Sequence, residues 1–436
     1  MTPALLFLAV ALQGPDTTAA PRRCEVVLDR AGYWVRQPVT ATLNNEYAGG
    51  GVVAHCRGTG SQLAADSVAW YPLARRFDMV GNVRIRDTAF TLDSRTAAYF
   101  TGDERLEAYT NVVAVNRQSG SVLRGPNLTY LRAAQGIRDT SDMRATGRPT
   151  IEYRAESDTT AEPYIIVADR VRMLGNDEVW AGGTVTIDRS DFAARGDSFA
   201  LDQGTGRGHL VGRRPPTIMG KGARPYTLEG TRIDLALERR DIRRVEANGT
   251  GHARGEDWEL AADTIHLAME QKKLQQAFAW GDSTRPTAVS SQQTIVADSL
   301  ALDVPDEVLT EVRAFGRAVS TTRRDTTAAA DVDWIAGDTV TARFDSETDS
   351  AGRRRTEIRQ ILARGSARAL THHYDEQRRG DPPAINYSRG DAISIALRRR
   401  RVDRVVVSGD GDGVHLEPRP VRPAPADSAK PAEVRP

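Results

Sequence analysis

Residues 260–267 place their apolar side chains at a spacing that a straight strand cannot satisfy. Leu260 and Ala262 alternate as residues on one face of a strand do, but the next apolar residues are Ile265 and Leu267. A strand can keep its apolar side inward through this slip only by accommodating an extra residue as a bulge or corner. The spacing therefore predicts a strand that turns a corner at Asp263.

The same pattern recurs along the chain. Its acidic corner residue is repeated at Asp66, Asp169, Asp197, Asp298, Asp338 and Asp391, and looser copies carry Arg95, Pro126 and Thr231 in that position. Before each copy, small or apolar residues surround a glycine: Gly81, Gly147, Gly182, Gly212, Gly249, Gly281, Gly316, Gly365 and Gly409. Asn111 fills this glycine slot once, and since Asn is the residue that best tolerates positive φ, the slot is predicted to be a backbone requirement. One unit is then two bent strands, and the repeats predict a stacked all-β array.

The repeats also divide the chain. We expect a signal peptide at 1–20, an N-terminal capping unit at 21–56, the repeats at 57–417 and a disordered proline-rich tail at 418–436. Polar insertions at 154–162, 320–332, 345–357 and 371–384 fall between the patterned elements and are predicted to be loops.

Composition narrows the functional classes. The chain has 59 basic and 58 acidic residues in 436 and a net charge of +1, which gives no general attraction to nucleic acid or to an acidic membrane. No apolar run reaches the roughly 18 residues that span a bilayer. Membrane contact is therefore expected only through partners.

The N-terminus points to export. An apolar run at 3–12 contains Ala9-Val10-Ala11, a small-x-small cleavage pattern, so export by a signal peptide is predicted; the alternative is an N-terminal tail without a targeting role. In an exported protein, Cys24 and Cys56 could form one disulfide that closes the terminal unit; the alternative is two buried free thiols.

Candidate chemistry is sparse. A catalytic site occurs once in a chain, whereas the corner Asp recurs, so these residues are interpreted as corner residues and no enzyme activity is expected. His372 and His373 lie in a polar stretch beside Asp375 and Glu376, where a solvated loop is favoured over a metal contact. No cofactor or metal site is predicted.

What remains is an inward stripe of mostly medium-sized aliphatic residues. Such a stripe either packs on itself as a filled core or, if two sheets stand apart, lines a groove suited to flexible acyl chains. Its members, the candidate groove residues, are Val83, Ile85, Val112, Leu128, Val171, Val185, Ile187, Phe199, Leu201, Ile233, Leu235, Ile265, Leu267, Leu300, Leu302 and Val340.

These repeats resemble those of the organic-solvent-tolerance (OstA-like) family. The resemblance is clearest at Gly81-Asn82-Val83 and at 63–68, 166–171 and 260–267, and it covers roughly residues 45–415. It implies an elongated, twisted β-jellyroll with an open apolar groove between two sheets, which shields the acyl chains of lipopolysaccharide or a related lipid on the way to the outer membrane.

Two functions of different class therefore stand as hypotheses. In the first, the protein is a non-enzymatic periplasmic carrier or bridge, whose end strands join other bridge proteins or further copies of itself by β-augmentation. In the second, it is a structural or adhesive β-solenoid with a filled core and no lipid cargo.

Overall fold

The computed structural model describes residues 24–418, except 58–59, 89, 118, 155–161, 176–177, 223, 239–240, 257, 291–292, 324–331, 349–353, 374–381 and 399–400. The predicted signal peptide and all but the first residue of the predicted tail lie outside this part. Strands make up 76% of the structure. Among the described residues the helical conformation is limited to a short 3-10 turn, Pro305–Glu307. The predicted all-β class is confirmed.

The chain divides into two compact units, Met1–Asn248 and Gly249–Pro436, called the N-terminal and C-terminal units below. The N-terminal unit holds β1 (Glu25–Arg30), β2 (Tyr33–Pro38), β3 (Asn44–Arg57), β4 (Gln62–Tyr71), β5 (Arg76–Arg86), β6 (Phe90–Phe100), β7 (Arg105–Asn116), β8 (Val122–Leu131), β9 (Asp142–Thr146), β10 (Thr150–Tyr153), β11 (Tyr164–Val167), β12 (Arg170–Leu174), β13 (Glu178–Asp188), β14 (Phe192–Asp202), β15 (Arg207–Val211), β16 (Thr217–Gly220), β17 (Tyr226–Glu229) and β18 (Arg232–Glu238). The boundary falls within β19 (Asp241–Arg254).

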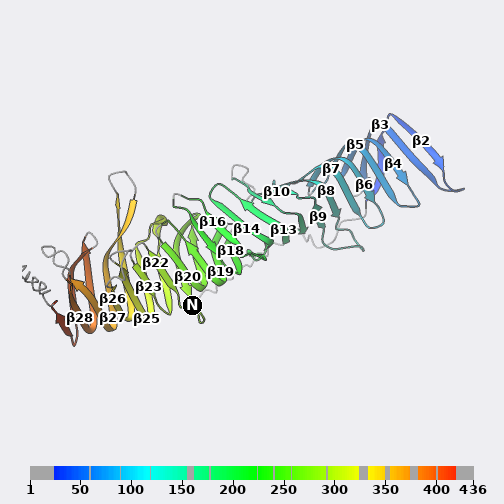
Figure 1. The fold of residues 1–436 in the computed structure, drawn as a ribbon. Coiled ribbons are helices and arrows are strands. Elements are labelled where there is room, and N and C mark those ends of the chain that lie inside the picture. Colours follow the sequence, from blue (N-terminus) through cyan, green and yellow to red (C-terminus); the bar gives the residue numbers. More distant parts are fainter. Residues whose placement is uncertain are drawn as a thin grey trace, which may run out of the picture. The chain divides into compact units, whose positions relative to one another are not determined.

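The C-terminal unit holds β20 (Trp258–Glu270), β21 (Lys273–Trp280), β22 (Thr287–Ser290), β23 (Gln293–Val296), β24 (Ser299–Asp303), β25 (Glu311–Arg323), β26 (Val332–Thr348), β27 (Arg354–His373), β28 (Ala384–Arg398), β29 (Arg401–Ser408) and β30 (Asp412–Leu416). Figure 1 labels many of these strands and shows that successive strands lie side by side within each unit.

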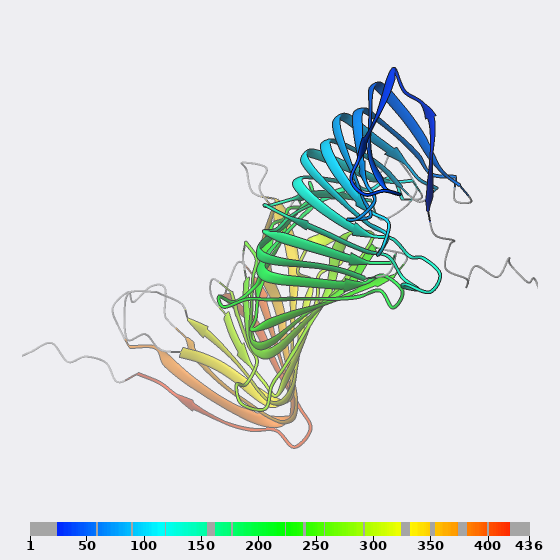
Figure 2. The same cartoon turned by 90° about the vertical axis from the view of Figure 1, so that its right-hand side faces the viewer.

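Neighbouring strands pair twice, once on each side of a break in register. In β4 and β5, for example, residues 62–64 pair with 84–86, and after the break 67–71 pair with 76–80. All pairings on one side of the break form one half-sheet, and all pairings on the other side form a second half-sheet. The first half-sheet of the N-terminal unit includes β1, β10, β11, β16 and β17, and the second includes β2, β9, β12, β15 and β18. Figure 2 shows the strands bending between their ends.

The break is a corner in which two residues oppose one. Between β25 and β26 the register passes from Phe315↔Thr339 to Ala318↔Gly337, so Gly316 and Arg317 oppose Asp338 alone. Both opposing residues have positive φ, 75° and 45°. Equivalent pairs stand at Gly81-Asn82, Gly183-Thr184 and Gly365-Ser366, opposite Arg95, Asp197 and Asp391. The bulge predicted from the one-residue slip is confirmed.

The glycine slot is only partly as predicted. Positive φ is found at Gly81, Gly147, Gly249, Gly316, Gly365 and Gly409, and at Asn111. The prediction is wrong by one residue at Gly182, because Gly183 has the positive φ of 77°. Gly212 and Gly281 do not have positive φ; lack of space explains their glycine, since a Cβ on Gly281 would lie 2.6 Å from the Thr284 carbonyl oxygen.

β8 and β13 each continue through the corner. In the chain between them, each pass, meaning one crossing of both half-sheets, is interrupted at the corner and forms two short strands. The pairings β8–β9, β9–β12, β12–β13, β13–β11, β11–β10 and β10–β8 therefore close a small six-stranded barrel by pairing. The interrupted passes are β9 to β10 and β11 to β12. This ring arises because β8 and β13 each supply strand to both half-sheets.

The predicted insertions are shorter than expected, because strands continue into them. β25 reaches Arg323, β26 runs from Val332 to Thr348, and β27 runs from Arg354 to His373. The remaining parts, 155–161, 324–331, 349–353 and 374–381, lie outside the described residues. Polar composition therefore marked these connections but overestimated their length, since a strand of paired backbone tolerates polar residues on its solvent face.

The described ends of the array carry edge strands. β1 and β2 pair with β3 on one side, and β29 and β30 pair with β28. Within the described residues no strand covers their other sides. These strands expose apolar side chains, including Tyr33 (59%), Trp34 (48%), Val414 (54%) and Leu416 (56%).

Candidate functional site

The predicted stripe faces inward in both units. All of its members are buried, with exposed fractions from 0% for Ile233, Ile265, Leu267 and Val340 to 9% for Ile85. Alternation explains this result: in β5, Val83 and Ile85 are buried while Arg84 between them is exposed. Each fully buried aliphatic side chain stabilises the fold by about 1.5–3 kcal/mol. The stripe therefore forms part of the hydrophobic core. Whether it also forms a binding site depends on the presence of cavities beside it.

An entrance cavity of about 480 Å³ lies at the N-terminal end between the half-sheets. Val26, Val52 and Leu63 line it from the first half-sheet, and Trp70 and Phe77 from the second. The Trp70 and Phe77 rings stack with centroids 4.1 Å apart. Because apolar side chains of both half-sheets line this space, the two half-sheets do not pack fully against each other here.

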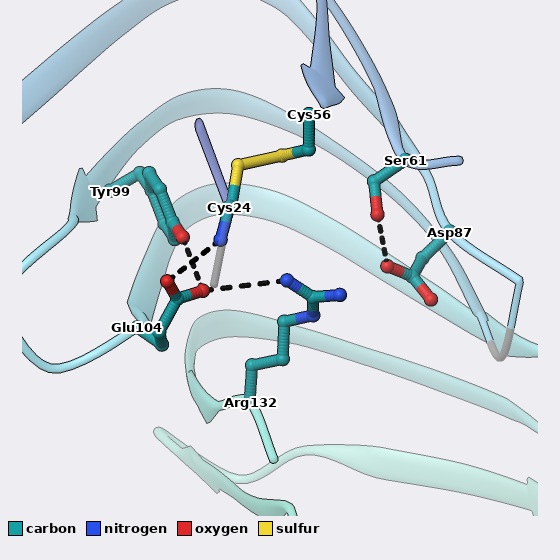
Figure 3. The surroundings of a disulfide bond; sticks show 7 residues. All are labelled: Cys24, Cys56, Ser61, Asp87, Tyr99, Glu104 and Arg132. Carbon is teal, nitrogen blue, oxygen red and sulfur yellow. Dashed lines mark hydrogen bonds and ion pairs between the residues drawn. A yellow bond between two sulfur atoms is a disulfide. The ribbon is translucent and has the colours of Figure 1, made fainter. Parts of the chain in front are cut away.

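A second space, the disulfide cavity, has a volume of about 60 Å³ and shares Cys24, Val26, Ala54, Leu63 and Tyr99 with the entrance cavity. Cys24 and Cys56 form a disulfide beside it, as Figure 3 shows. Cys24 immediately precedes β1, and Cys56 lies in β3, so the bond ties the edge strand to its neighbour.

Glu104 ties the two half-sheets together at this point. Glu104 lies in the turn before β7 and is 1% exposed. Its carboxylate accepts hydrogen bonds from the Cys24 N–H at 2.9 Å and the Tyr99 hydroxyl at 2.6 Å. The Arg132 Nη1 atom lies 3.4 Å away and compensates its charge (Figure 3). Burial, and then the bond to Glu104, raise the pKa of Tyr99, so the phenol stays protonated as a donor.

A third space, the methionine cavity, has a volume of about 280 Å³. Leu123, Ile151 and Tyr153 of the first half-sheet face Met143 and Met173 of the second across it. It shares Phe90 and Tyr130 with the disulfide cavity, and these rings meet edge to face with centroids 4.6 Å apart. Burial raises the pKa of Tyr130 to about 12. These three cavities of the N-terminal unit follow one another, and neighbouring cavities share lining residues.

A smaller space lies in the C-terminal unit. The cavity between its half-sheets that is lined by Ile335, Ile361 and Ile395 measures about 30 Å³, room for about one or two waters. Ser320 and Thr322 are polar lining residues: Ser320 accepts a hydrogen bond from Gln293, and Thr322 donates one to Gln293 at 3.0 Å. Ser320 is fully buried. These polar groups find partners within the protein, as buried groups must.

The prediction that His372 lies in a solvated loop is wrong. β27 extends through His373, and His372 is only 7% exposed. Its backbone N–H donates to Asp333 Oδ1 at 2.8 Å, and its Nδ1 lies 2.9 Å from the same oxygen. Asp333 belongs to the neighbouring strand β26, so long-range strand pairing created a contact that the local polar composition concealed.

The corner residues act structurally in the described part of the chain. Asp263 accepts hydrogen bonds from the backbone N–H of Ser283 at 2.7 Å and of Thr284 at 3.2 Å, which lower the pKa of its carboxyl group. Asp298 bonds to Arg317 at 2.8 Å, and that contact lowers its pKa. Each aspartate thus links its own corner to the corner of the neighbouring part of the chain.

No family model matches the chain, and no curated protein matches it. Within the described residues, no three His, Cys, Asp or Glu side chains are grouped so that they could hold a metal ion. A search of the same residues found no helix with the length and apolar character of a membrane span.

The sequence missed the residues that line the cavities most directly. Tyr130 and Met173 lie two positions beyond the predicted Leu128 and Val171, on the same faces and nearer the free ends of the half-sheets. Extending the period of two would have found them. Glu104 carried no such signal, because its partners depend on the meeting of distant strands.

Proposed function

We propose that this protein is a non-enzymatic periplasmic carrier that shields acyl chains of lipopolysaccharide or a related lipid between its half-sheets. The observation that carries the proposal is the series of cavities in the N-terminal unit, lined by apolar side chains from both half-sheets. Flexible chains suit such adjacent apolar spaces better than a rigid ligand does, because a chain can bend past the Glu104 and Phe90–Tyr130 side chains that line them.

Further features support the same function. The bent, doubly paired strands are consistent with a twisted β-jellyroll, and the apolar spaces between the half-sheets are consistent with a groove that takes acyl chains. The Cys24–Cys56 disulfide is consistent with an oxidising compartment outside the cytoplasm. The sequence resemblance to the organic-solvent-tolerance family implies the same cargo and location.

Partners would join at the edge strands. Among the described residues, β1 and β2 of the N-terminal unit and β29 and β30 of the C-terminal unit each have one edge without a partner strand, and they expose apolar side chains. Other bridge proteins or further copies of this chain are the partners proposed, and contact with a membrane would pass through them. The balanced charge supplies no general affinity for nucleic acid.

Photo-crosslinking tests the carrier function. A benzophenone amino acid replaces Trp70 or Leu63, which line the entrance cavity, or Ile265 in the C-terminal core, and purified protein is mixed with lipopolysaccharide. Arg84, exposed on the outer face of β5, provides the control position. Saturable adducts at Trp70 and Leu63, and none at Arg84, are expected. Equal labelling at all positions, or none, would refute the carrier.

The second function, a structural or adhesive β-solenoid with a filled core, is favoured by the C-terminal unit. Leu260, Ile265, Leu267 and Leu300 are among its largest fully buried side chains. A filled core predicts no saturable binding of an acyl-chain dye to the folded protein, whereas the carrier predicts saturable binding that Trp70 and Leu63 substitutions reduce.

A further inference from the structure

The methionine cavity differs from the rest of the interior in its charge. Among the described residues that line it, Glu178 is the only one with an ionisable charge near neutral pH, and Glu178 is exposed at the start of β13. The adjoining disulfide cavity, in contrast, is lined by Asp87, Glu104 and Arg132. An anion entering the methionine cavity would meet no cation among its described lining residues.

Apart from the exposed Glu178, the polar residues that line this cavity among those described are neutral. Asn116, Ser121 and Ser141 line it, and the Tyr153 hydroxyl, from the first half-sheet, donates to Gln203 Oε1, beyond β14, at 3.1 Å. These hydroxyl and amide groups can both donate and accept hydrogen bonds. Arg154 contributes its backbone N–H to Ser121 Oγ at 3.0 Å. Its side chain is not part of the lining, but its Cδ lies 3.6 Å from a Cβ built on Gly120, next to Ser121.

The apolar lining of the cavity combines packed and adaptable side chains. Leu123, Ile151 and Val179 are 1–5% exposed and form packed walls. Met143 and Met173 pair across β9 and β12 and are only half-buried. Unbranched thioether side chains fill irregular space and adjust readily to a flexible chain. The volume of about 280 Å³ is near the lower limit for small-molecule pockets, about 300 Å³.

We propose that the methionine cavity is a distinct binding site for a single-chain lipid with an uncharged, hydroxyl-bearing head group, such as a monoacylglycerol. The alkyl chain lies against Met143 and Met173, and the head group exchanges hydrogen bonds with Ser121, Ser141 and Asn116. A fatty acid of equal length binds more weakly when ionised, because its carboxylate would lose water and no described lining residue supplies a cation. The inference rests on the proposed interior binding of acyl chains but concerns a different ligand.

The test uses two photoreactive probes with the same diazirine-bearing chain, one a monoacylglycerol and the other a free fatty acid, at pH 8 with the full chain. Peptide mapping by mass spectrometry locates the adducts. We expect saturable labelling of the Met143 and Met173 peptides by the glycerol probe, and at least about tenfold less by the fatty acid, since tenfold corresponds to 1.4 kcal/mol. Equal labelling by the two probes, or no saturable labelling of these peptides, would overturn the inference.

Two substitutions sharpen the result. Met143→Trp fills the cavity and should abolish labelling, whereas Thr129→Trp, on an outward position of β8, should leave it unchanged. Ser141→Arg places a cation in the lining of the cavity and should raise fatty-acid labelling about tenfold, whereas Thr140→Arg, on the exposed neighbour, should not. If lipopolysaccharide still crosslinks at Trp70 while these peptides stay unlabelled, the carrier function survives and this site alone fails.

Discussion

Asp338 lies directly over Gly365. A Cβ built on Gly365 would stand 2.2 Å from the Asp338 Oδ2 atom, and the backbone of Gly365 has a φ of 74°. The same relation joins Asp66 to Gly81, Asp169 to Gly183, Asp298 to Gly316 and Asp391 to Gly409. The corner aspartate and the glycine slot, which are the two parts of the sequence repeat, therefore lie in contact. The aspartate side chain of one repeat occupies the space that a side chain at the glycine of the next repeat would need.

Gly365→Ala should destabilise the C-terminal unit by about 2–4 kcal/mol, because alanine adds strain at positive φ and a clash with Asp338. Urea unfolding measures the loss. Gly136→Ala is the matched control, since Gly136 has a φ of 73° and nothing within 4 Å of its built Cβ. The control should lose only about 1 kcal/mol. Restoring about half of the loss by combining Gly365→Ala with Asp338→Ala would identify the clash, and equal losses in the two glycine variants would contradict it.

Acid should weaken the corner at Asp263. The folded-state pKa of this carboxyl group is lowered below its usual value of 3.8 by the backbone N–H of Ser283 and Thr284. The stability it contributes is thus fully present above the unfolded-state pKa and is lost as pH falls through the folded-state pKa. Asp263→Asn should reduce stability above about pH 4 and match the wild type at lower pH.

Unfolding curves recorded between about pH 2 and pH 7 check this dependence. Asp139→Asn serves as the control, because Asp139 is exposed in a loop away from the corners. A stability difference between wild type and Asp263→Asn that stays constant over the whole pH range would rule out the linkage.

Glu104 should hold the edge strand β1 in place. Glu104→Ala leaves the Cys24 N–H and the Tyr99 hydroxyl without their buried acceptor, at a cost of about 1–3 kcal/mol for each group. Hydrogen exchange of the Glu25–Arg30 peptide should therefore accelerate although the disulfide remains. The exchange of Asp412–Leu416 provides an internal reference, and unchanged protection of β1 would show that Glu104 is dispensable.

The disulfide should add to this restraint. Cys24 and Cys56 are 32 residues apart, and closing a loop of that length stabilises by about 3–4 kcal/mol in the chain-entropy model. Cys24→Ser combined with Cys56→Ser should lower the urea midpoint and speed exchange in β1. An unchanged midpoint would indicate that β1 unfolds independently of the remaining strands.

Self-association should depend on the end strands. Val414→Lys in β30 or Val35→Lys in β2 places a charge on an exposed edge and should weaken any oligomer at least about tenfold in sedimentation experiments. Leu73→Lys, at a residue that is 67% exposed between β4 and β5, should have no effect. If all three variants associate alike, the contacts lie elsewhere.

The corner could be predicted because its causes are local. The slip from Ala262 to Ile265 requires an extra residue whatever the strand pairs with, and Asn111 in the glycine slot identifies a positive φ, found at 56°. The inward stripe follows from the same alternation. The error at Gly182 shows the limit of this reasoning, since composition alone did not distinguish two adjacent glycines.

The cavities could not be predicted, because their volume depends on the separation of two half-sheets and not on the pattern of either one. Leu302 and Tyr130 obey the same period, yet Leu302 is 2% exposed in a packed core and Tyr130 lines open space. Their surroundings are set by side chains from strands remote in sequence.

The sequence by itself therefore determined the all-β class, the position of the corners and the face that each strand turns inward, because neighbouring residues impose these through backbone geometry and alternation. Only the tertiary structure decided where the interior is filled and where it is hollow. It also decided that Glu104 meets Cys24 across 80 residues and that Asp333 meets His372 across 39. Such contacts depend on the register and spacing of strands that meet only after the chain has folded.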